Sequence, residues 1–204
     1  ARRAVTELGT PGILVHPLLH EAIGNHPLDD AYFLPIYEEA EGLDVPILYH
    51  AQHPFGSFIY DRYQTHFRRH AITFPLSIMM ACMDAVCGGV MERFTKLRVA
   101  FFEGSAGWMP WFLDRLDEHF EKLPHFVPHI ADKPSILFRH YIDQGRVFWS
   151  CEPDEKYLPF VVQEYGEDFI VYASDYPHWD CEYPESARII GGRSDLTESA
   201  KRKI

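Results

Sequence analysis

Short apolar runs alternate along the chain with longer segments whose apolar residues recur at helical spacing. The short runs are rich in β-branched and aromatic residues, a composition that favours strands. The longer segments carry apolar residues near positions i, i+3, i+4 and i+7, and several of them end in glycine, as helices often do. We therefore predict strands at 12–17, 45–51, 97–104, 145–153 and 168–178, and helices at 30–43, 75–95, 107–123 and 154–166.

The alternation of strands and helices predicts an α/β fold with a parallel sheet, because a crossover helix returns the chain to the end where the previous strand began. The near-continuous apolar runs indicate strands that helices cover. Two connections, 52–73 and the proline-rich 123–140, show no such period, and we expect them to be long loops. Long loops in compact domains are often lids or binding loops.

A polar or ionisable side chain follows the apolar part of each predicted strand. Parallel strands end on the same side of a sheet or barrel, so these side chains are expected to converge there. They are His16, His50, Glu103, Ser150 with Glu152, and Asp175.

Imidazoles and carboxylates gathered at the carboxyl ends of parallel strands are typical of a divalent metal site. His50 and Asp175 are the best candidate ligands. Each residue also has a plainer interpretation. A strand-end Asp often caps the next helix, Glu103 has the same option, and an isolated His after an apolar run is often a satisfied core residue. The joint placement at strand ends favours the metal site, because independent caps would not need to alternate between His and acids.

Charge and cysteine content narrow the class of protein. The 204 residues include 19 Lys and Arg against 30 Asp and Glu, a net charge of −11, which argues against nucleic acid or an anionic membrane as partner. The longest apolar stretch, 77–91, contains Asp84 and is shorter than the roughly 18 residues of a membrane span. The first residues lack a secretory signal, so we expect a cytoplasmic protein. The four cysteines form no CxxC pair and are expected to be reduced thiols.

Three segments resemble the amidohydrolase-related (type 2) family, which includes aminocarboxymuconate-semialdehyde decarboxylase and related metal-dependent decarboxylases and hydrolases. They are VPILYHA at 45–51, CGGVMERFTKLRVAFFEGSAGWMPWFLDRLDEHFEK at 87–122 and YASDYPHWD at 172–180. The resemblance implies a TIM-type (β/α)8 barrel with one divalent metal ion, zinc or alternatively manganese, at the carboxyl ends of the strands. It also implies a small-molecule substrate and a homodimer or higher homo-oligomer.

The resemblance assigns roles to five residues. His50 follows the fifth barrel strand as a metal ligand, and Asp175 follows the eighth as a second ligand and a catalytic proton acceptor. Glu103 stands at the end of the sixth strand, where many decarboxylases of the family have a catalytic His. Either Glu103 takes over there as the catalytic base or as the partner of a metal-bound water, or the decarboxylase chemistry is lost and another reaction, or none, replaces it. Trp108 and His178 are implied to line the substrate pocket.

The chain departs from the family at both ends. No His-x-His or Glu-x-His pair, which supplies two further ligands on the first strand of the family, occurs near 12–17, and 195–204 lacks the Asn-Ala-x-Arg motif of the last helix. Five strands cannot close an eight-stranded barrel. We expect residues 1–204 to be the C-terminal part of one metal-dependent hydrolase domain, with strands 4 to 8 present and the N-terminal strands missing.

The leading hypothesis is a metal-dependent enzyme that hydrolyses or decarboxylates a small organic acid or ring carbonyl compound. Arg62, Arg68, Arg69 and His70 are candidates for binding a substrate anion. The alternative is a non-catalytic barrel homologue or fragment that serves as an interaction module, with the aromatic segment 108–112 as its interface. A nucleotide-binding domain is disfavoured, because no strand is followed by a Gly-x-Gly-x-x-Gly turn.

Overall fold

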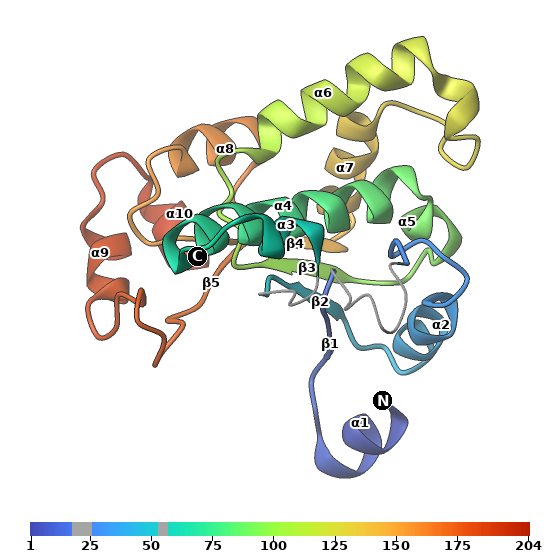
Figure 1. The fold of residues 1–204 in the computed structure, drawn as a ribbon. Helices are drawn as coiled ribbons and strands as arrows, with labels where there is room; N and C mark the ends of the chain where they lie inside the picture. The colour runs from blue at the N-terminus through green and yellow to red at the C-terminus, as the bar shows by residue number, and fades with distance from the viewer. Residues whose placement is uncertain (18–25, 53–56) are drawn as a thin grey trace.

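All five predicted strands are present in the computed structural model, which describes residues 1–17, 26–52 and 57–204 (Figure 1). Every neighbouring pair of strands is parallel, and the order in the sheet is β1-β2-β3-β4-β5. A doubly wound sheet would reverse its strand order at a switch point. Here the order follows the chain, as it does in the wall of a barrel. The strands are β1 Ile13–Val15, β2 Ile47–His50, β3 Val99–Phe102, β4 Val147–Cys151 and β5 Ile170–Tyr172.

From the first strand onward, helices alternate with the strands along the chain. The four predicted helices correspond to α2, α4 with α5, α6 and α8. The helices are α1 Arg2–Leu8, α2 Leu34–Gly42, α3 Phe58–Arg62, α4 His66–Cys87, α5 Val90–Arg93, α6 Met109–Lys122, α7 Pro134–Asp143, α8 Leu158–Tyr165, α9 Ser186–Gly192 and α10 Glu198–Lys203, with a short 3-10 helix at Pro124–Phe126.

The core lies between the strands and the helices, and its largest members are aromatic. Phe101 of β3, Trp149 of β4 and Phe138 of α7 are almost completely buried. The Trp149 ring lies 4.6 Å from the Phe101 ring and 5.8 Å from the Phe138 ring, centroid to centroid. Buried aromatic groups of this size contribute much of the apolar burial that stabilises a domain. The core therefore fixes β3 and β4 side by side, and these strands carry Glu103 and Glu152 at their ends.

The expectation that 52–73 and 123–140 are loops is wrong where helices occupy them, at 58–62, 66–73, 124–126 and 134–140, whereas 63–65 and 127–133 are irregular as expected. Helix α4 begins at His66 and carries Pro75 in its interior, where proline usually breaks a helix because it has no N–H to donate. The sequence pattern placed the helix start at that proline. In the second segment, Pro134 is the first residue of α7, a position that suits proline because no N–H is needed there.

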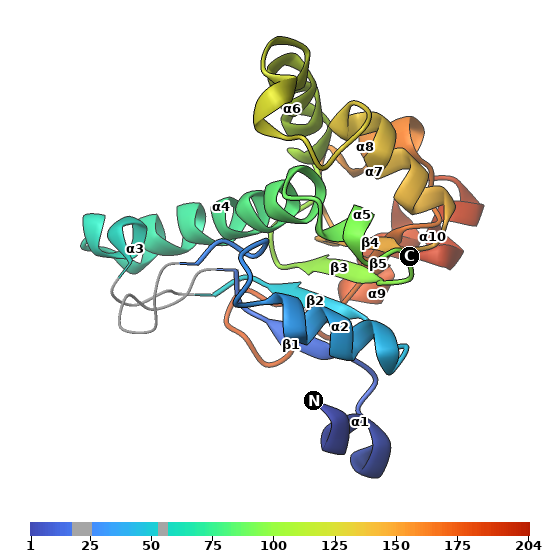
Figure 2. The same cartoon turned by 90° about the vertical axis from the view of Figure 1, so that its right-hand side faces the viewer.

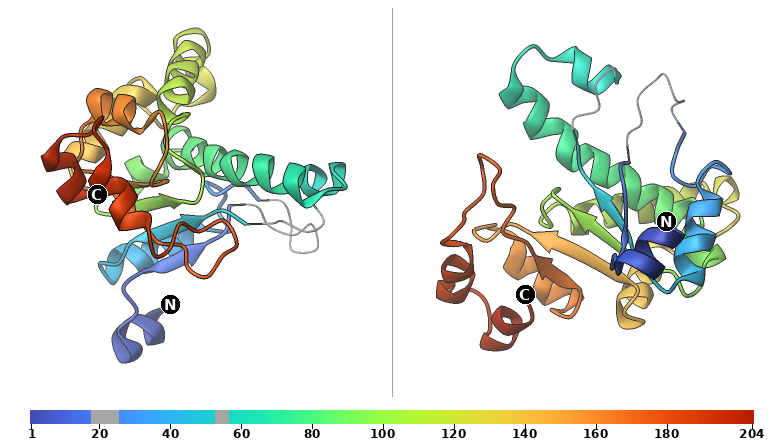
Figure 3. Two further views of the ribbon diagram at one scale, coloured as in Figure 1. Left: turned by 90° about the vertical axis from the view of Figure 1, so that its left-hand side faces the viewer. Right: turned by 90° about the horizontal axis from the view of Figure 1, so that it is seen from below.

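Helix α4 overlaps the apolar stretch 77–91, which is too short for a membrane span, but the helix itself is longer than that stretch. With 22 residues it is long and apolar enough to cross a membrane, by length and composition alone. That is weak evidence, because a core helix of a soluble protein passes the same test. Ile78, Ala81 and Ala85 of α4 are fully buried, and the helix contacts β2 and β3. Figures 2 and 3 show its first half, together with α3, extending past the sheet.

Candidate active site

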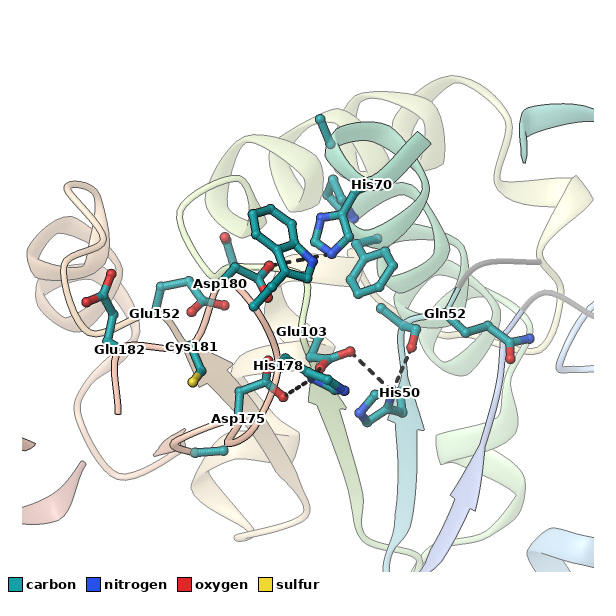
Figure 4. Close-up of a pocket in the computed structure, with 18 of the residues that line it drawn as sticks. His50, Gln52, His70, Glu103, Glu152, Asp175, His178, Asp180, Cys181 and Glu182 are labelled. Carbon is teal, nitrogen blue, oxygen red and sulfur yellow. Dashed lines mark hydrogen bonds and ion pairs between the residues drawn. The ribbon is translucent and has the colours of Figure 1, made fainter. Parts of the chain in front are cut away.

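Five of the six polar residues that were expected to converge line one cleft of about 780 Å³ at the carboxyl ends of the strands (Figure 4), and Ser150 is not among the lining residues. The predicted convergence is therefore confirmed for one residue after each strand. Side chains of α4 and of the segment after β5 complete the walls. The converging residues are His16, His50, Glu103, Glu152 and Asp175.

Glu103 and Asp175 both have a backbone conformation that residues with a side chain rarely adopt. Their φ angles are +61° and +54°, in the left-handed region. Such a conformation costs on the order of 1–3 kcal/mol per residue and persists only where the surrounding structure imposes it, which is frequent at active sites. Two of the three acids that the sequence pattern selected are thus also positions at which the backbone takes a left-handed conformation.

Three side chains place their ligand atoms close enough together to hold one metal ion. The carboxylates of Glu103 and Asp175 and the imidazole of His178 offer atoms that all lie within 4.8 Å of one another. His178 Nδ1 is 2.8 Å from Asp175 Oδ1 and 3.7 Å from Glu103 Oε1. His178 was expected only to line the pocket, and the structure places its imidazole between the two acids.

His50 lies beside this cluster rather than inside it. Its Nδ1 is 2.6 Å from the carbonyl oxygen of Ala51 and 3.3 Å from Glu103 Oε2. Since a carbonyl oxygen only accepts, Nδ1 carries the proton and Nε2 is left as the nitrogen that is free of a proton. Burial lowers the pKa of His50, which also favours the neutral ring. His50 is thus prepared as a ligand, and that role stays a prediction.

Acidic side chains are the most frequent ionisable groups besides histidine in the lining of the cleft. Burial raises the pKa of Glu103, and the neighbouring Asp175 raises it further. Burial and the adjacent Glu155 raise the pKa of Glu152 to about 7. Asp180 and Glu182 add two more acids, yet neither Lys nor Arg occurs among the described residues that line the cleft. Perturbed acids in a cleft are typical of functional sites, and the described lining offers them no Lys or Arg as a partner.

The opposite wall of the cleft comes from α4 and from the segment after β5. His70 Nε2 lies 3.5 Å from Asp180 Oδ2, and the His70 ring stacks on Phe74 at 4.1 Å between centroids. Of the proposed anion-binding groups on 62–70, only His70 lines the cleft. Arg69 instead donates to the carbonyl oxygens of Tyr60 and Tyr63.

Trp108 lines the cleft as the resemblance implies, but its indole is also fixed in the wall. Trp108 Nε1 donates to the carbonyl oxygen of Gly104 at 2.5 Å, and its ring packs edge-on against Trp149 at 5.1 Å between centroids. Asp180, Glu182 and Trp179 were not singled out from the sequence. They could have been found from the sequence, because they lie within seven residues of Asp175 in the segment that follows the last strand.

The amidohydrolase family model, Amidohydro_2, matches residues 1–204. The chain is 30% identical over 178 residues to 2-amino-3-carboxymuconate-6-semialdehyde decarboxylase of Dictyostelium discoideum, covering 86% of this chain and 46% of that protein. It is 25% identical over 183 residues to gamma-resorcylate decarboxylase of Rhizobium sp. (strain MTP-10005), covering 86% and 54%. The chain thus spans about half the length of these curated relatives.

Solved structures share the fold over the whole of this chain. An amidohydrolase from Mycobacterium avium subsp. paratuberculosis has a TM-score of 0.76 at 19% identity, with 52% of that chain covered. A dihydroxybenzoic acid decarboxylase from Polaromonas sp., solved with bound manganese and an inhibitor, has a TM-score of 0.74 at 20% identity, with 60% covered. The five parallel strands in sequential order are accordingly part of a TIM-type barrel. Because the family model matches this chain from residue 1 to residue 204, the chain belongs to the amidohydrolase family.

Proposed function

We propose that this chain forms part of a metal-dependent decarboxylase that acts on a small organic acid. The observation that carries the proposal is the convergence of Glu103, Asp175 and His178 in a cleft whose described lining contains acids but no Lys or Arg. The relatives support the choice of reaction, because two of them are named as decarboxylases. Hydrolysis of a ring carbonyl compound is the alternative reaction for the same site.

The donor set fits a divalent cation. Carboxylate oxygen and imidazole nitrogen both bind zinc and manganese, and two carboxylates neutralise a charge of +2. Without a cation, Glu103 and Asp175 face each other as like charges, which is one reason that the pKa of Glu103 rises. We expect Glu103, Asp175 and His178 to hold the ion, with His50 beside them. Manganese is preferred over zinc, since a related decarboxylase was solved with manganese.

When bound, the cation supplies Lewis acidity that holds and polarises a substrate oxygen. The side chains of this chain do the rest. In decarboxylation a C–C bond breaks, CO2 leaves, and a proton takes its place on carbon. Glu152 lines the cleft, and its pKa of about 7 leaves it partly protonated at neutral pH, so that it can donate this proton. Asp175 orients His178 through the 2.8 Å contact between Oδ1 and Nδ1. For hydrolysis, Asp175 would instead accept a proton from the attacking water.

We also propose that residues 1–204 are the C-terminal part of the barrel, strands 4 to 8. Support comes from the sequential parallel order and from the 46% and 54% of the curated relatives that the chain matches. The interaction-module alternative gains no support from these relatives. The raised pKa values of Glu103 and Glu152 also favour a catalytic site over a docking surface.

The test is release of CO2 from 2,6-dihydroxybenzoate and from 5-carboxyvanillate, the compounds named for related decarboxylases. The full natural chain is stripped with a chelator and assayed with and without added Mn²⁺. Release that requires Mn²⁺ and is lost in Asp175→Asn supports the proposal. Asp114→Asn, a change of the same chemistry at an exposed site on α6, serves as the control. A folded protein that binds Mn²⁺ and these acids but releases no CO2 from any of them contradicts it.

A further inference from the structure

The loop at 103–108, between β3 and α6, is held from one side by β4. The hydroxyl of Ser150 accepts a hydrogen bond from the backbone N–H of Glu103 at 3.1 Å. The indole of Trp149, which is fully buried, donates to the carbonyl oxygen of Ser105 at 2.9 Å. Ser105, like Glu103, has a left-handed φ, of +58°. Two such residues in one short loop need strong external contacts to keep their conformation.

The strongest of these contacts comes from the side chain of Glu155, just after β4. Its carboxylate accepts from the backbone N–H of Ala106, at 2.8 Å to Oε1 and 3.0 Å to Oε2, and from the backbone N–H of Gly107. Oε2 also accepts from the N–H of Glu152 at 3.4 Å. Hydrogen bonds to an ionised acceptor are roughly twice as strong as neutral ones. Glu155 therefore ties together the two loops that present Glu103 and Glu152 to the cleft.

Glu155 is itself held in place by Arg193 and is closely packed against Gly107. The guanidinium of Arg193 donates to the backbone carbonyl oxygens of Glu155, at 2.7 Å, and of Pro153, at 3.0 Å. A Cβ added to Gly107 would lie 2.9 Å from Glu155 Oε1 and 2.6 Å from Tyr157 Cβ. Distances below 3.0 Å force something to move, so the absence of a side chain at Gly107 leaves room for both Tyr157 and the Glu155 carboxylate to approach the loop.

The carboxylate at Glu155 also has an electrostatic cost. It stands near a cleft that already holds several acids, and its charge disfavours the ionised form of Glu152. A neutral acceptor would make some of the same hydrogen bonds without that repulsion. The benefit that offsets the cost is geometric, because one carboxylate accepts from three backbone amides on two loops.

We propose that Glu155 is a positioning residue: its carboxylate fixes loop 103–108 and thereby holds the Glu103 side chain toward the divalent cation. This inference rests on the proposed function, because it assigns Glu155 a role at the same metal site. Groups that orient metal ligands without touching the metal typically change metal affinity by about 10–100-fold when they are removed. The loss of Glu155 is expected to fall in that range.

The experiment is a calorimetric titration of the chelator-stripped full natural chain with Mn²⁺, with the Tm recorded for each variant. Glu155→Ala is expected to weaken Mn²⁺ binding by about 10–100-fold. Glu155→Gln, which keeps one acceptor oxygen, should recover part of that loss. Gly107→Ala should also weaken binding, because its new methyl group would meet Tyr157 Cβ and Glu155 Oε1 and so push the loop and the carboxylate apart. Glu164→Ala, which removes an exposed glutamate from α8, should bind as the wild type does.

The outcomes separate the positioning role from the function that it rests on. If the wild type binds Mn²⁺ and folded Glu155→Ala binds it equally well, the positioning role is wrong and the metal site stands. A lower Tm with unchanged affinity also overturns the positioning role, because a merely structural role lowers stability alone. If Glu155→Ala does not fold, Glu155→Gln and Gly107→Ala decide by the same comparison of affinities. A folded wild type that binds no Mn²⁺ overturns the metal site and the positioning role together.

Discussion

Mn²⁺ binding to this chain is expected to release a proton from Glu103 and to weaken as the pH falls. Burial and the facing Asp175 raise the pKa of Glu103 to about 8 in the free protein. A carboxyl group binds a cation only after it loses its proton, so metal binding is coupled to proton release. The group is protonated below its pKa and ionised above it. Affinity is therefore full above about pH 8 and is lost as the pH falls below that value.

The size of the effect follows from the raised pKa. Below a pKa of about 8, each pH unit lowers the apparent affinity about tenfold, which is about 1.4 kcal/mol. A glutamate at the ordinary pKa of about 4.3 would be fully ionised between about pH 6 and pH 7 and would give no such slope. Between those two pH values the expected change is thus about tenfold, against none for an unperturbed acid.

Isothermal titration calorimetry measures both quantities. Titrations at about pH 6 and about pH 7, each in two buffers that differ in ionisation enthalpy, give the affinity and the number of protons released per Mn²⁺. We expect about one proton for the wild type. Glu103→Gln should bind more weakly and release about one proton fewer, which separates Glu103 from the histidines of the site. Glu164→Gln, at an exposed position, is the control. Equal affinity at both pH values, with no proton released, refutes the assignment of Glu103 as a ligand with a raised pKa.

Three further changes test the stability of the fold and of the site. Burial raises the pKa of Asp84 to about 6, so its ionisation destabilises the fold by about 2–3 kcal/mol as the pH rises from about 4 to about 6. In urea denaturation, Asp84→Asn should lose this dependence of the unfolding free energy on pH. A dependence in the variant equal to that of the wild type contradicts the prediction. Trp149→Ala should cost about 3–5 kcal/mol in the same assay, because the indole is fully buried, and a loss below about 1 kcal/mol would show a tolerant core. Mn²⁺ at about 100 times its Kd should raise the free energy of unfolding by about 2.7 kcal/mol; Asp175→Asn should lose most of this gain, and an undiminished gain in that variant would place the ion elsewhere.

The strands and the strand-end acids were predictable because both depend on local pattern. Runs such as 97–104 are β-branched and aromatic, and Glu103 and Asp175 stand where parallel strands end, so topology alone brings them together. The start of α4 was not predictable, since Pro75 lies inside the helix and a local rule places it at a boundary.

The contacts that shape the site depend on long-range geometry, which residue pattern does not encode. Glu155 binds amides 48 and 49 positions earlier in the chain. His178 was placed in the pocket by resemblance, but its position between two acids depends on the left-handed turn at Asp175, an unusual conformation for a residue with a side chain. The roles of Glu155 and His178 therefore depend on backbone conformations, at loop 103–108 and at Asp175, that are seen only in the folded structure.

The central claim, that Glu103, Asp175 and His178 bind one divalent cation, is tested most directly by metal analysis of the purified full natural chain. After equilibration with Mn²⁺ and removal of the excess, we expect about one equivalent of manganese per chain. In the Asp175→Asn, His178→Ala double variant we expect a small fraction of that amount. A wild-type protein that is folded and retains no metal, or a double variant that retains as much as the wild type, contradicts the claim.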